Sequence, residues 1–217
     1  RRGAYSQTLV FDKGLEFIEN NHNYDNWFLQ IESFDPHEPF DVPEEYQQQY
    51  GIGNSFPYDW PAYAQVREDD AFVGNIRKKY YALLTMCDHS LGRVLDMMDQ
   101  HDMWKDTMLI VNTDHGFLLG EHRWWAKNVM PMYNEIAHLP LFIWDPRSGI
   151  QNEHRSALVQ TIDLPATILS FFGQPIPTDM MGRDLASVIR SDQRVRDYAL
   201  FGMFAGHVNI TDGKYVY

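Results

Sequence analysis

The sequence predicts an α/β protein, because segments of helical period alternate with short apolar runs along its 217 residues. Loops rich in proline and glycine separate these segments, and no internal repeat or low-complexity tract interrupts them. With 44% hydrophobic and 14% aromatic residues, the chain can bury a sizeable core. We therefore expect a globular fold of one domain or slightly more.

The first half of the chain contains two predicted helices separated by a long irregular region. Apolar side chains recur at helical spacing from Thr8 to about Asn20 and again, most regularly, from Asn75 to His101. Between them, residues Trp27 to Ser33 are typical of a strand. Phe34 to Asp70 holds five prolines and shows no sustained period. Loops of that length usually serve a function, so we expect this one to line a site.

The second half begins with two apolar strands. Met108 to Thr113 and Leu139 to Trp144 are short apolar runs of the kind that form core strands. The segment from Asp163 to Phe172 predicts a helix whose N-cap is Asp163 and whose end is set by Gly173. These elements continue the alternation of strand and helix.

The pattern changes after about residue 195. Two strand-like segments, Ala199 to Ile210 and Lys214 to Tyr217, flank Thr211-Asp212-Gly213, a favourable hairpin turn. We therefore predict an α/β domain over residues 1–194 and the start of a small antiparallel subdomain over residues 195–217.

Composition excludes several classes of partner. The 30 acidic and 18 basic residues give a formal net charge of -12, which argues against a nucleic-acid footprint and against an anionic membrane surface. No run approaches the roughly 18 apolar residues of a membrane span. The single cysteine excludes an internal disulfide and a cysteine-rich zinc site. The chain does not begin with Met, so we expect a fragment, and the compartment and oligomeric state stay open.

The strongest chemical signal is the sequence Val111 to Gly116, in which an apolar strand ends in Asp114 and His115. Ligands of open α/β sheets bind outside the carboxyl ends of strands, so these side chains are delivered to the place of a site. Adjacent oxygen and nitrogen donors suit a divalent cation. The alternative is that Asp114 is only a cap or turn residue at the strand end.

Further motifs follow in a fixed order around this dipeptide, and together they resemble the sulfatase family of the alkaline phosphatase superfamily. They are Ser33-Phe34-Asp35-Pro36-His37-Glu38-Pro39-Phe40, Leu119-Gly120-Glu121-His122, Trp124-Trp125-Ala126-Lys127-Asn128, Tyr133-Asn134-Glu135, His138-Leu139-Pro140-Leu141, Asp163-Leu164-Pro165-Ala166-Thr167 and Gly182-Arg183. The resemblance implies an alkaline-phosphatase-like three-layer sandwich with a mostly parallel central sheet, incomplete here, and the start of a small C-terminal antiparallel sheet.

The resemblance also implies roles for individual residues. Asp114 and His115 match a pair of metal ligands, with Ca²⁺ the first expectation and Mn²⁺, Mg²⁺ or Zn²⁺ as alternatives. Lys127 matches a lysine that contacts both the anion and the nucleophile, whereas a solvated surface lysine is the plain alternative. His37 matches a histidine that stabilises or protonates the leaving group, against packing in a proline-rich turn. His122 is expected only to shape the loop beside the metal ligands.

The sequence departs from the family at the nucleophile. Members use a formylglycine made in a Cys-x-Pro-x-Arg type motif, or Ser or Thr in phosphate-cleaving relatives. Cys87 is followed by Asp88-His89 on the apolar stripe of a helix, which indicates a packed thiol. The paired N-terminal aspartates of the family's metal site have no counterpart either. We therefore expect these residues alone to be inactive.

Three functions remain open at this point. The first is metal-dependent hydrolysis of a small-molecule or saccharide sulfate ester. The second is hydrolysis of a phosphonate monoester or phosphodiester, which a histidine at position 115 fits equally well. The third is a noncatalytic binding module, against which the joint presence of His37, Asp114, His115 and Lys127 argues.

Overall fold

The computed structural model describes residues 5–53, 56–203 and 205–217. These residues form two compact units, and each unit is made of two separate segments of the chain. The first unit contains the described residues up to Met103 together with Phe117–Met130, and the second contains Trp104–Gly116 and Pro131–Tyr217. Neither unit is delimited at residue 194, so the predicted division of the chain there stays a prediction.

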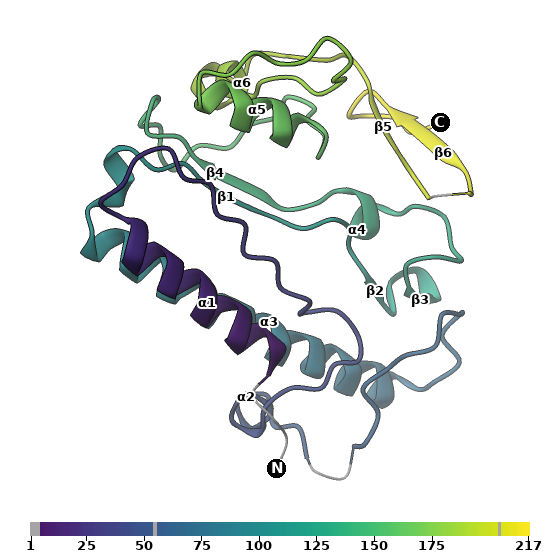
Figure 1. Ribbon diagram of the computed structural model, residues 1–217. Helices are drawn as coiled ribbons and strands as arrows, with labels where there is room; N and C mark the ends of the chain where they lie inside the picture. Colours follow the sequence, from purple (N-terminus) through teal and green to yellow (C-terminus); the bar gives the residue numbers. More distant parts are fainter. Residues whose placement is uncertain (1–4, 54–55, 204) are drawn as a thin grey trace. The chain divides into compact units, whose positions relative to one another are not determined.

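The first unit is built on two long helices that pack side by side (Figure 1). Helix α1 spans Ser6–Asn21 and helix α3 spans Asp70–Gln100, which confirms both predicted helices. Helix α3 begins five residues earlier than predicted, because the side chain of Asp69 accepts a hydrogen bond from the backbone N–H of Phe72 at 2.8 Å and caps it.

The segment between the two helices is irregular, as predicted, apart from the short helix α2, Glu44–Gln49. It is nevertheless anchored, because Phe40, Val42 and Val66 are buried in the same core cluster as residues of α3. The 3-10 turn Glu121–Arg123 separates two short strands, β2 (Leu118–Leu119) and β3 (Trp125–Ala126), which pair with each other and add to this core.

The strand predicted over Trp27 to Ser33 is wrong. These residues alternate between partly buried and exposed side chains, as an extended chain does, but they belong to no strand. A strand exists only when a neighbour pairs with its backbone, and no such partner lies in the described part of the chain. The alternation of side chains therefore predicts an extended chain but not the pairing that a strand requires.

The second unit contains the two apolar strands that the sequence predicts. Strand β1 spans Leu109–Asn112 and pairs with β4, Leu141–Trp144, in register from Leu109↔Trp144 to Asn112↔Leu141. The pair is antiparallel, as are β2–β3 and β5–β6, so the mostly parallel pairing that we expected is not found among the described residues. A parallel pair needs a crossover that carries the chain back to the end of the sheet at which the first strand began, whereas β4 runs in the direction opposite to β1.

Three short helices complete this unit: α4 (Asn134–Ala137), α5 (Asp163–Phe171) and α6 (Ala186–Ser191). Helix α5 confirms the predicted helix, and Gly173 follows it with a left-handed φ of 64°. The N-cap position is occupied by Ile162, however, and not by Asp163. Helix α6 was not predicted, because six residues carry too little periodicity to be recognised.

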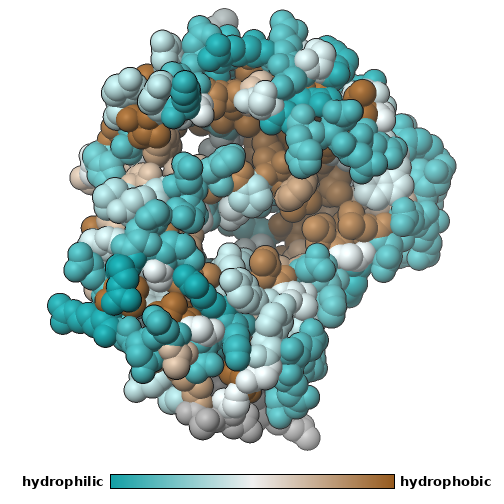
Figure 2. Space-filling view, turned by 180° about the vertical axis from the view of Figure 1, so that it is seen from behind, coloured by the Kyte–Doolittle hydropathy of each residue, from teal (hydrophilic) through white to brown (hydrophobic). Residues whose placement is uncertain are grey.

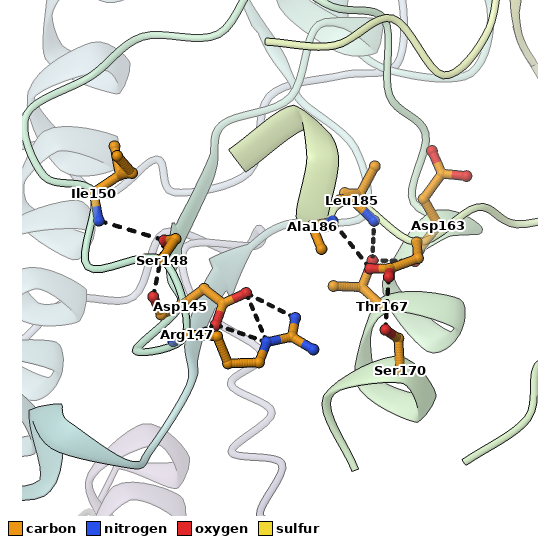
Figure 3. Close-up of polar contacts among 10 residues, drawn as sticks. Asp145, Arg147, Ser148, Ile150, Asp163, Thr167, Ser170, Leu185 and Ala186 are labelled. Atoms are coloured by element: carbon orange, nitrogen blue, oxygen red, sulfur yellow. Dashed lines mark hydrogen bonds and ion pairs between the residues drawn. The ribbon is translucent and has the colours of Figure 1, made fainter. Parts of the chain in front are cut away.

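Asp163 instead joins α5 to the segments around it. Its carboxylate is fully buried, accepts hydrogen bonds from the backbone N–H groups of Gln160 and Arg183, and pairs with Arg196. Neighbouring polar contacts have the same effect (Figure 3): the Thr167 hydroxyl accepts the N–H of Leu185 at 3.0 Å. Arg183 is thus placed by a backbone contact.

The tail forms the antiparallel pair β5 (Ala199–Gly202) and β6 (Val208–Thr211). The long strand predicted from Ala199 to Ile210 is therefore two strands, with a connection in which Phe204 lies outside the described residues. The chain turns back after β6, as predicted, since Ile210 and Tyr217 exchange both backbone hydrogen bonds at 2.9 Å. Thr211 belongs to β6, however, and the strand predicted over Lys214 to Tyr217 contributes only an isolated bridge between Thr211 and Val216.

Apolar side chains also reach the surface alongside hydrophilic ones (Figure 2). Phe28 in the first unit is 58% exposed, and Phe142 on β4 is 67% exposed. Among the described helices, none combines the length and the apolar content that crossing a bilayer requires.

Candidate functional site

The first unit brings together two of the residues that the sequence singled out, although they are 90 positions apart. The ammonium Nζ of Lys127 lies 2.7 Å from Nε2 of the His37 imidazole. The Lys127 side chain is 9% exposed and that of His37 is 33% exposed, so the imidazole provides the more open side of the pair. Lys127 is therefore no solvated surface lysine.

Packing and hydrogen bonds hold the segments that carry both residues. Lys127 follows β3, in which Trp125 and Ala126 are fully buried. The indole N–H of Trp125 donates to the Glu68 carboxylate at 3.0 Å, and this hydrogen bond lowers the pKa of Glu68. His37 lies in the turn after Phe34, whose ring is 4.4 Å from the imidazole, centroid to centroid.

The apolar wall beside the lysine is Phe117. Its ring centroid lies 5.9 Å from Nζ of Lys127, within the range of a cation–π contact. Trp125, two residues before the lysine, turns into the core, where it packs edge-on against Phe72.

A third member of this cluster, Glu38, was missed by the sequence analysis. Its side chain is 1% exposed, and Oε1 lies 3.7 Å from Nζ of Lys127 while also accepting a hydrogen bond from the Tyr63 hydroxyl. Burial, together with that hydrogen bond, raises the pKa of Tyr63. Glu38 lies in the segment Ser33 to Phe40, in which the resemblance implies a role only for His37.

The partners of His37 determine where its proton lies. Nδ1 faces two acceptors, the backbone carbonyl of Glu38 at 2.6 Å and the carboxylate Oε2 of Glu38 at 3.3 Å. Nε2 faces the Lys127 ammonium, which can only donate. The resting imidazole therefore carries its hydrogen on Nδ1 and offers a lone pair at Nε2.

The second unit presents Asp114 and His115 at the end of β1, as predicted. The Asp114 side chain is 84% exposed, and its Oδ2 lies 3.6 Å from Nε2 of His115. Nδ1 of His115 is 2.9 Å from the backbone carbonyl of Gly116, so the hydrogen belongs on Nδ1 and the Nε2 lone pair is left available. Both donor atoms can thus be offered to one cation.

The glycine that follows is required by packing. The backbone N–H of Gly116 donates to the carbonyl of Ile136 in α4 at 2.9 Å. A Cβ on Gly116 would lie 2.8 Å from the carbonyl carbon of Glu135 and closer still to its oxygen. The Asp-His-Gly sequence therefore combines two donors with the only residue that lets the chain pass so close to α4.

The last candidate, His122, lies in the first unit, and its role stays a prediction. His122 has a left-handed φ of 54° inside the 3-10 turn Glu121–Arg123. The neighbouring Glu121 holds that turn by accepting the N–H of Leu119 at 2.6 Å and pairing with Arg77 at 3.0 Å. Across the described ranges, no three His, Cys, Asp or Glu side chains gather as a ready metal site. Asp114 and His115 are two candidate donors, fewer than a complete coordination shell contains.

Cys87 is the packed thiol that the sequence predicts. Its Sγ donates to Oε1 of Gln7, a fully buried amide, at 3.3 Å. Burial, with a contribution from the Asp35 charge, raises the pKa of Cys87 to about 12. A thiol in that environment is a poor nucleophile.

Comparison with known proteins gives a consistent result. A family model described as Sulfatase matches residues 1–174. An arylsulfatase of Clostridium perfringens is 26% identical over 229 residues, covering 93% of this chain and 46% of that protein. Arylsulfatase K of Canis lupus familiaris is 37% identical over 114 residues, covering 52% of this chain and 21% of that protein. The chain thus spans about half or less of the length of these relatives.

Solved structures show the same fold. A protein determined in complex with its substrate D-glucosamine-2-N,6-O-disulfate superposes with a TM-score of 0.81 at 16% identity, over 98% of this chain and 60% of that one. The phosphonate monoester hydrolase of Silicibacter pomeroyi superposes with a TM-score of 0.77 at 23% identity, over 98% of this chain and 51% of that one. The expected α/β, alkaline-phosphatase-like fold is confirmed by these likenesses.

Proposed function

The chain belongs to the sulfatase family of hydrolases, and on that premise we propose that the whole protein hydrolyses sulfate esters with the help of a bound divalent metal ion. The observation that carries the proposal is the contact between Lys127 and His37, two side chains 90 positions apart that meet at 2.7 Å. A merely structural lysine has no need of an imidazole partner that is itself one-third exposed.

The two side chains suit complementary parts of an ester hydrolysis. An ammonium group supplies several charge-assisted hydrogen bonds to a sulfate oxyanion, and its effect is strong where burial excludes water, as it does at the 9% exposed Lys127. The more open His37 can contact the ester oxygen and hand it a proton when the bond to sulfur breaks. The electron pair of that bond then stays on the protonated leaving oxygen.

Asp114 and His115 are the residues that we propose as metal ligands. Oδ2 and Nε2 are 3.6 Å apart, a separation that two bonds of roughly 2.0–2.6 Å to one ion can span. Such an ion polarises an oxygen of the bound anion. Ca²⁺ is the first expectation for a shell completed by oxygen ligands, and Mn²⁺, Mg²⁺ or Zn²⁺ would fit direct bonding by His115.

The relatives suggest the class of substrate. One protein of Bacteroides thetaiotaomicron that is 30% identical over 53% of this chain is an N-acetylglucosamine-6-O-sulfatase. We therefore propose a saccharide or small-molecule sulfate ester. The second candidate is a phosphonate monoester, because the Silicibacter pomeroyi hydrolase shares the fold.

The nucleophile is the part of the reaction that these 217 residues do not supply. The sequence contains no Cys-x-Pro-x-Arg motif, and Cys87 is a half-buried thiol that donates to Gln7 and has a raised pKa. We propose that residues 1–217 expressed alone bind anions and metal weakly and do not turn over an ester.

Hydrolysis by the protein expressed from its complete reading frame tests the proposal. We expect turnover of 4-nitrophenyl sulfate to exceed that of 4-nitrophenyl phenylphosphonate, to fall about a hundredfold or more in Lys127→Ala, and to stay unchanged in the control Lys13→Ala, whose side chain is 79% exposed. The reverse preference would establish the phosphonate candidate, and equal loss in both variants would argue against a role for Lys127.

A metal titration separates an enzyme from a noncatalytic module. Calorimetry with CaCl₂, and in parallel with MnCl₂, is expected to give weaker binding to Asp114→Ala than to the wild type, together with lower turnover. Unchanged affinity in Asp114→Ala would count heavily for a module that has kept the fold alone.

A further inference from the structure

We propose that Glu38 is a positioning residue for the reaction, which fixes the His37 imidazole and stabilises its protonated form beside Lys127. The inference rests on the proposed function, because it takes His37 as the acid for the leaving oxygen. It goes beyond that function because it gives a role to a buried carboxylate, which lies at a position where the family motif sets no residue. That role is to control the protonation of the acid.

The first observation is the burial of Glu38. A carboxylate with 1% exposure has lost its hydration, and burial of a charge is costly unless partners compensate for it. Oε1 is compensated by the Tyr63 hydroxyl and by the Lys127 ammonium at 3.7 Å. Oε2 has no hydrogen-bond partner among the described residues. The resting cluster therefore contains one carboxylate oxygen with unused capacity.

The second observation is the direction in which that oxygen lies. Oε2 is 3.3 Å from Nδ1 of His37, near enough for charge–charge attraction although Nδ1 directs its hydrogen to the Glu38 carbonyl at 2.6 Å. A positive charge on the imidazole would thus appear next to an uncompensated negative oxygen. Protonation of His37 compensates the negative charge of the buried Glu38 carboxylate. The carboxylate in turn stabilises the protonated imidazole.

The third observation concerns what else surrounds the imidazole. Lys127 is the positive group facing Nε2, Tyr63 approaches Glu38 from the loop before α3, and Asp35 belongs to the same turn as His37. The Phe34 ring lies against the imidazole and the Phe117 ring lies beside Lys127, and neither carries a charge. Since Lys127 disfavours a second positive charge at Nε2, a counterion is required on the other side of the ring, and Glu38 is placed there.

The proton balance follows from this arrangement. An imidazole with its hydrogen on Nδ1 alone must first take a proton at Nε2, from Lys127 or from solvent, before it can act as an acid. As the nucleophile, which residues 1–217 do not supply, forms its bond to sulfur, the sulfur–oxygen ester bond breaks. The electron pair of the broken bond stays on the leaving oxygen, which takes that Nε2 proton. His37 returns to the neutral form, and water restores the proton taken from the pair.

The test uses the complete protein and the variant Glu38→Gln. The pH above which kcat/KM declines reports loss of the proton from the acid. We expect this pH to fall by about one unit or more in Glu38→Gln, because removal of a neighbouring negative charge makes the imidazolium easier to deprotonate. The expected loss is in kcat, with KM for 4-nitrophenyl sulfate little changed. Glu45→Gln, which makes the same change on an exposed glutamate of α2, is expected to leave the profile unmoved.

A second measurement needs no turnover and no substrate. The measurement is the nitrogen-15 chemical shift of the histidine side chains, and the variant His37→Gln identifies the His37 signals among those of the nine histidines. We expect hydrogen on Nδ1 in the neutral wild-type imidazole. We also expect a lower titration midpoint for His37 in Glu38→Gln. If Glu38→Gln fails to fold, the wild-type tautomer alone decides, since hydrogen on Nε2 would overturn the proposal.

The two measurements keep this inference apart from the proposed function. An active wild type whose Glu38→Gln variant keeps the same pH profile and the same His37 midpoint would overturn the role of Glu38 while leaving the hydrolase intact. A protein that hydrolyses no sulfate ester, yet shows the shifted midpoint, would overturn the function and leave the electrostatic coupling standing.

Discussion

Replacement of Gly116 by alanine tests how the end of β1 is held in place. The added Cβ would lie 2.8 Å from the carbonyl carbon of Glu135 and 3.1 Å from Cα of Ile136, and it would overlap the Glu135 oxygen. These are backbone atoms of α4, so no flexible side chain can move aside. The chain must separate from α4 and lengthen the 2.9 Å hydrogen bond from Gly116 to Ile136.

The cost can be worked from these contacts. Overpacking costs about 1–3 kcal/mol and the weakened hydrogen bond about 1 kcal/mol more, so we expect Gly116→Ala to lose about 2–4 kcal/mol. For a chain of this size that is a fall in Tm of roughly 4–16 °C. Metal affinity should fall as well, since Asp114 and His115 move with the strand end.

Thermal unfolding followed by circular dichroism measures the effect, with Gly92→Ala as the matched control. Gly92 lies within α3, and a Cβ there would meet nothing within 4 Å. Alanine is the better helix former, so this control is expected to be neutral or stabilising by up to about 1 kcal/mol. A Gly116→Ala protein that melts with the wild type and binds metal equally well would refute the packing argument.

Two other predictions concern the half-buried thiol of Cys87 and the buried carboxylate of Asp163. Burial raises the pKa of Cys87 to about 12, so at about pH 8 the thiol should react with iodoacetamide roughly a thousandfold more slowly in the folded protein than in the urea-unfolded chain. The reaction rate of the folded protein should rise about tenfold per pH unit. Fast labelling of the folded protein would contradict the packing of Cys87. Asp163→Asn removes the buried partner of Arg196 and should lower the free energy of unfolding by about 3–5 kcal/mol, or Tm by roughly 6–20 °C. The control Asp197→Asn changes a side chain that is 76% exposed and should melt as the wild type does. Equal melting of both variants would show that the Asp163–Arg196 pair is not stabilising.

Much of the local structure could be predicted because it depends on local physics. Helical spacing of apolar residues located α1, α3 and α5, and the apolar runs located β1 and β4. The segment over residues 27–33 shows the limit of such reasoning. Alternation of side chains specifies an extended chain, but a strand also needs a partner, and the partner is not encoded in the segment itself.

The candidate site divides in the same way. Asp114 and His115 are neighbours in sequence, so their placement at a strand end followed from the strand alone. The meeting of His37 with Lys127 could be expected only from the family resemblance, because no local pattern links positions 90 apart. Glu38 and Tyr63 escaped notice since a buried carboxylate is recognised by its surroundings, which only the folded chain supplies.

The central claim is that His37 and Lys127 act as one unit on the ester. A double-mutant cycle on kcat/KM for 4-nitrophenyl sulfate, with His37→Ala, Lys127→Ala and the combined variant of the complete protein, tests it most directly. Two groups that work through their 2.7 Å contact should give a combined variant no more than a fewfold worse than the poorer single variant. Losses that multiply would show that the two residues act independently, and wild-type activity in either single variant would contradict the account.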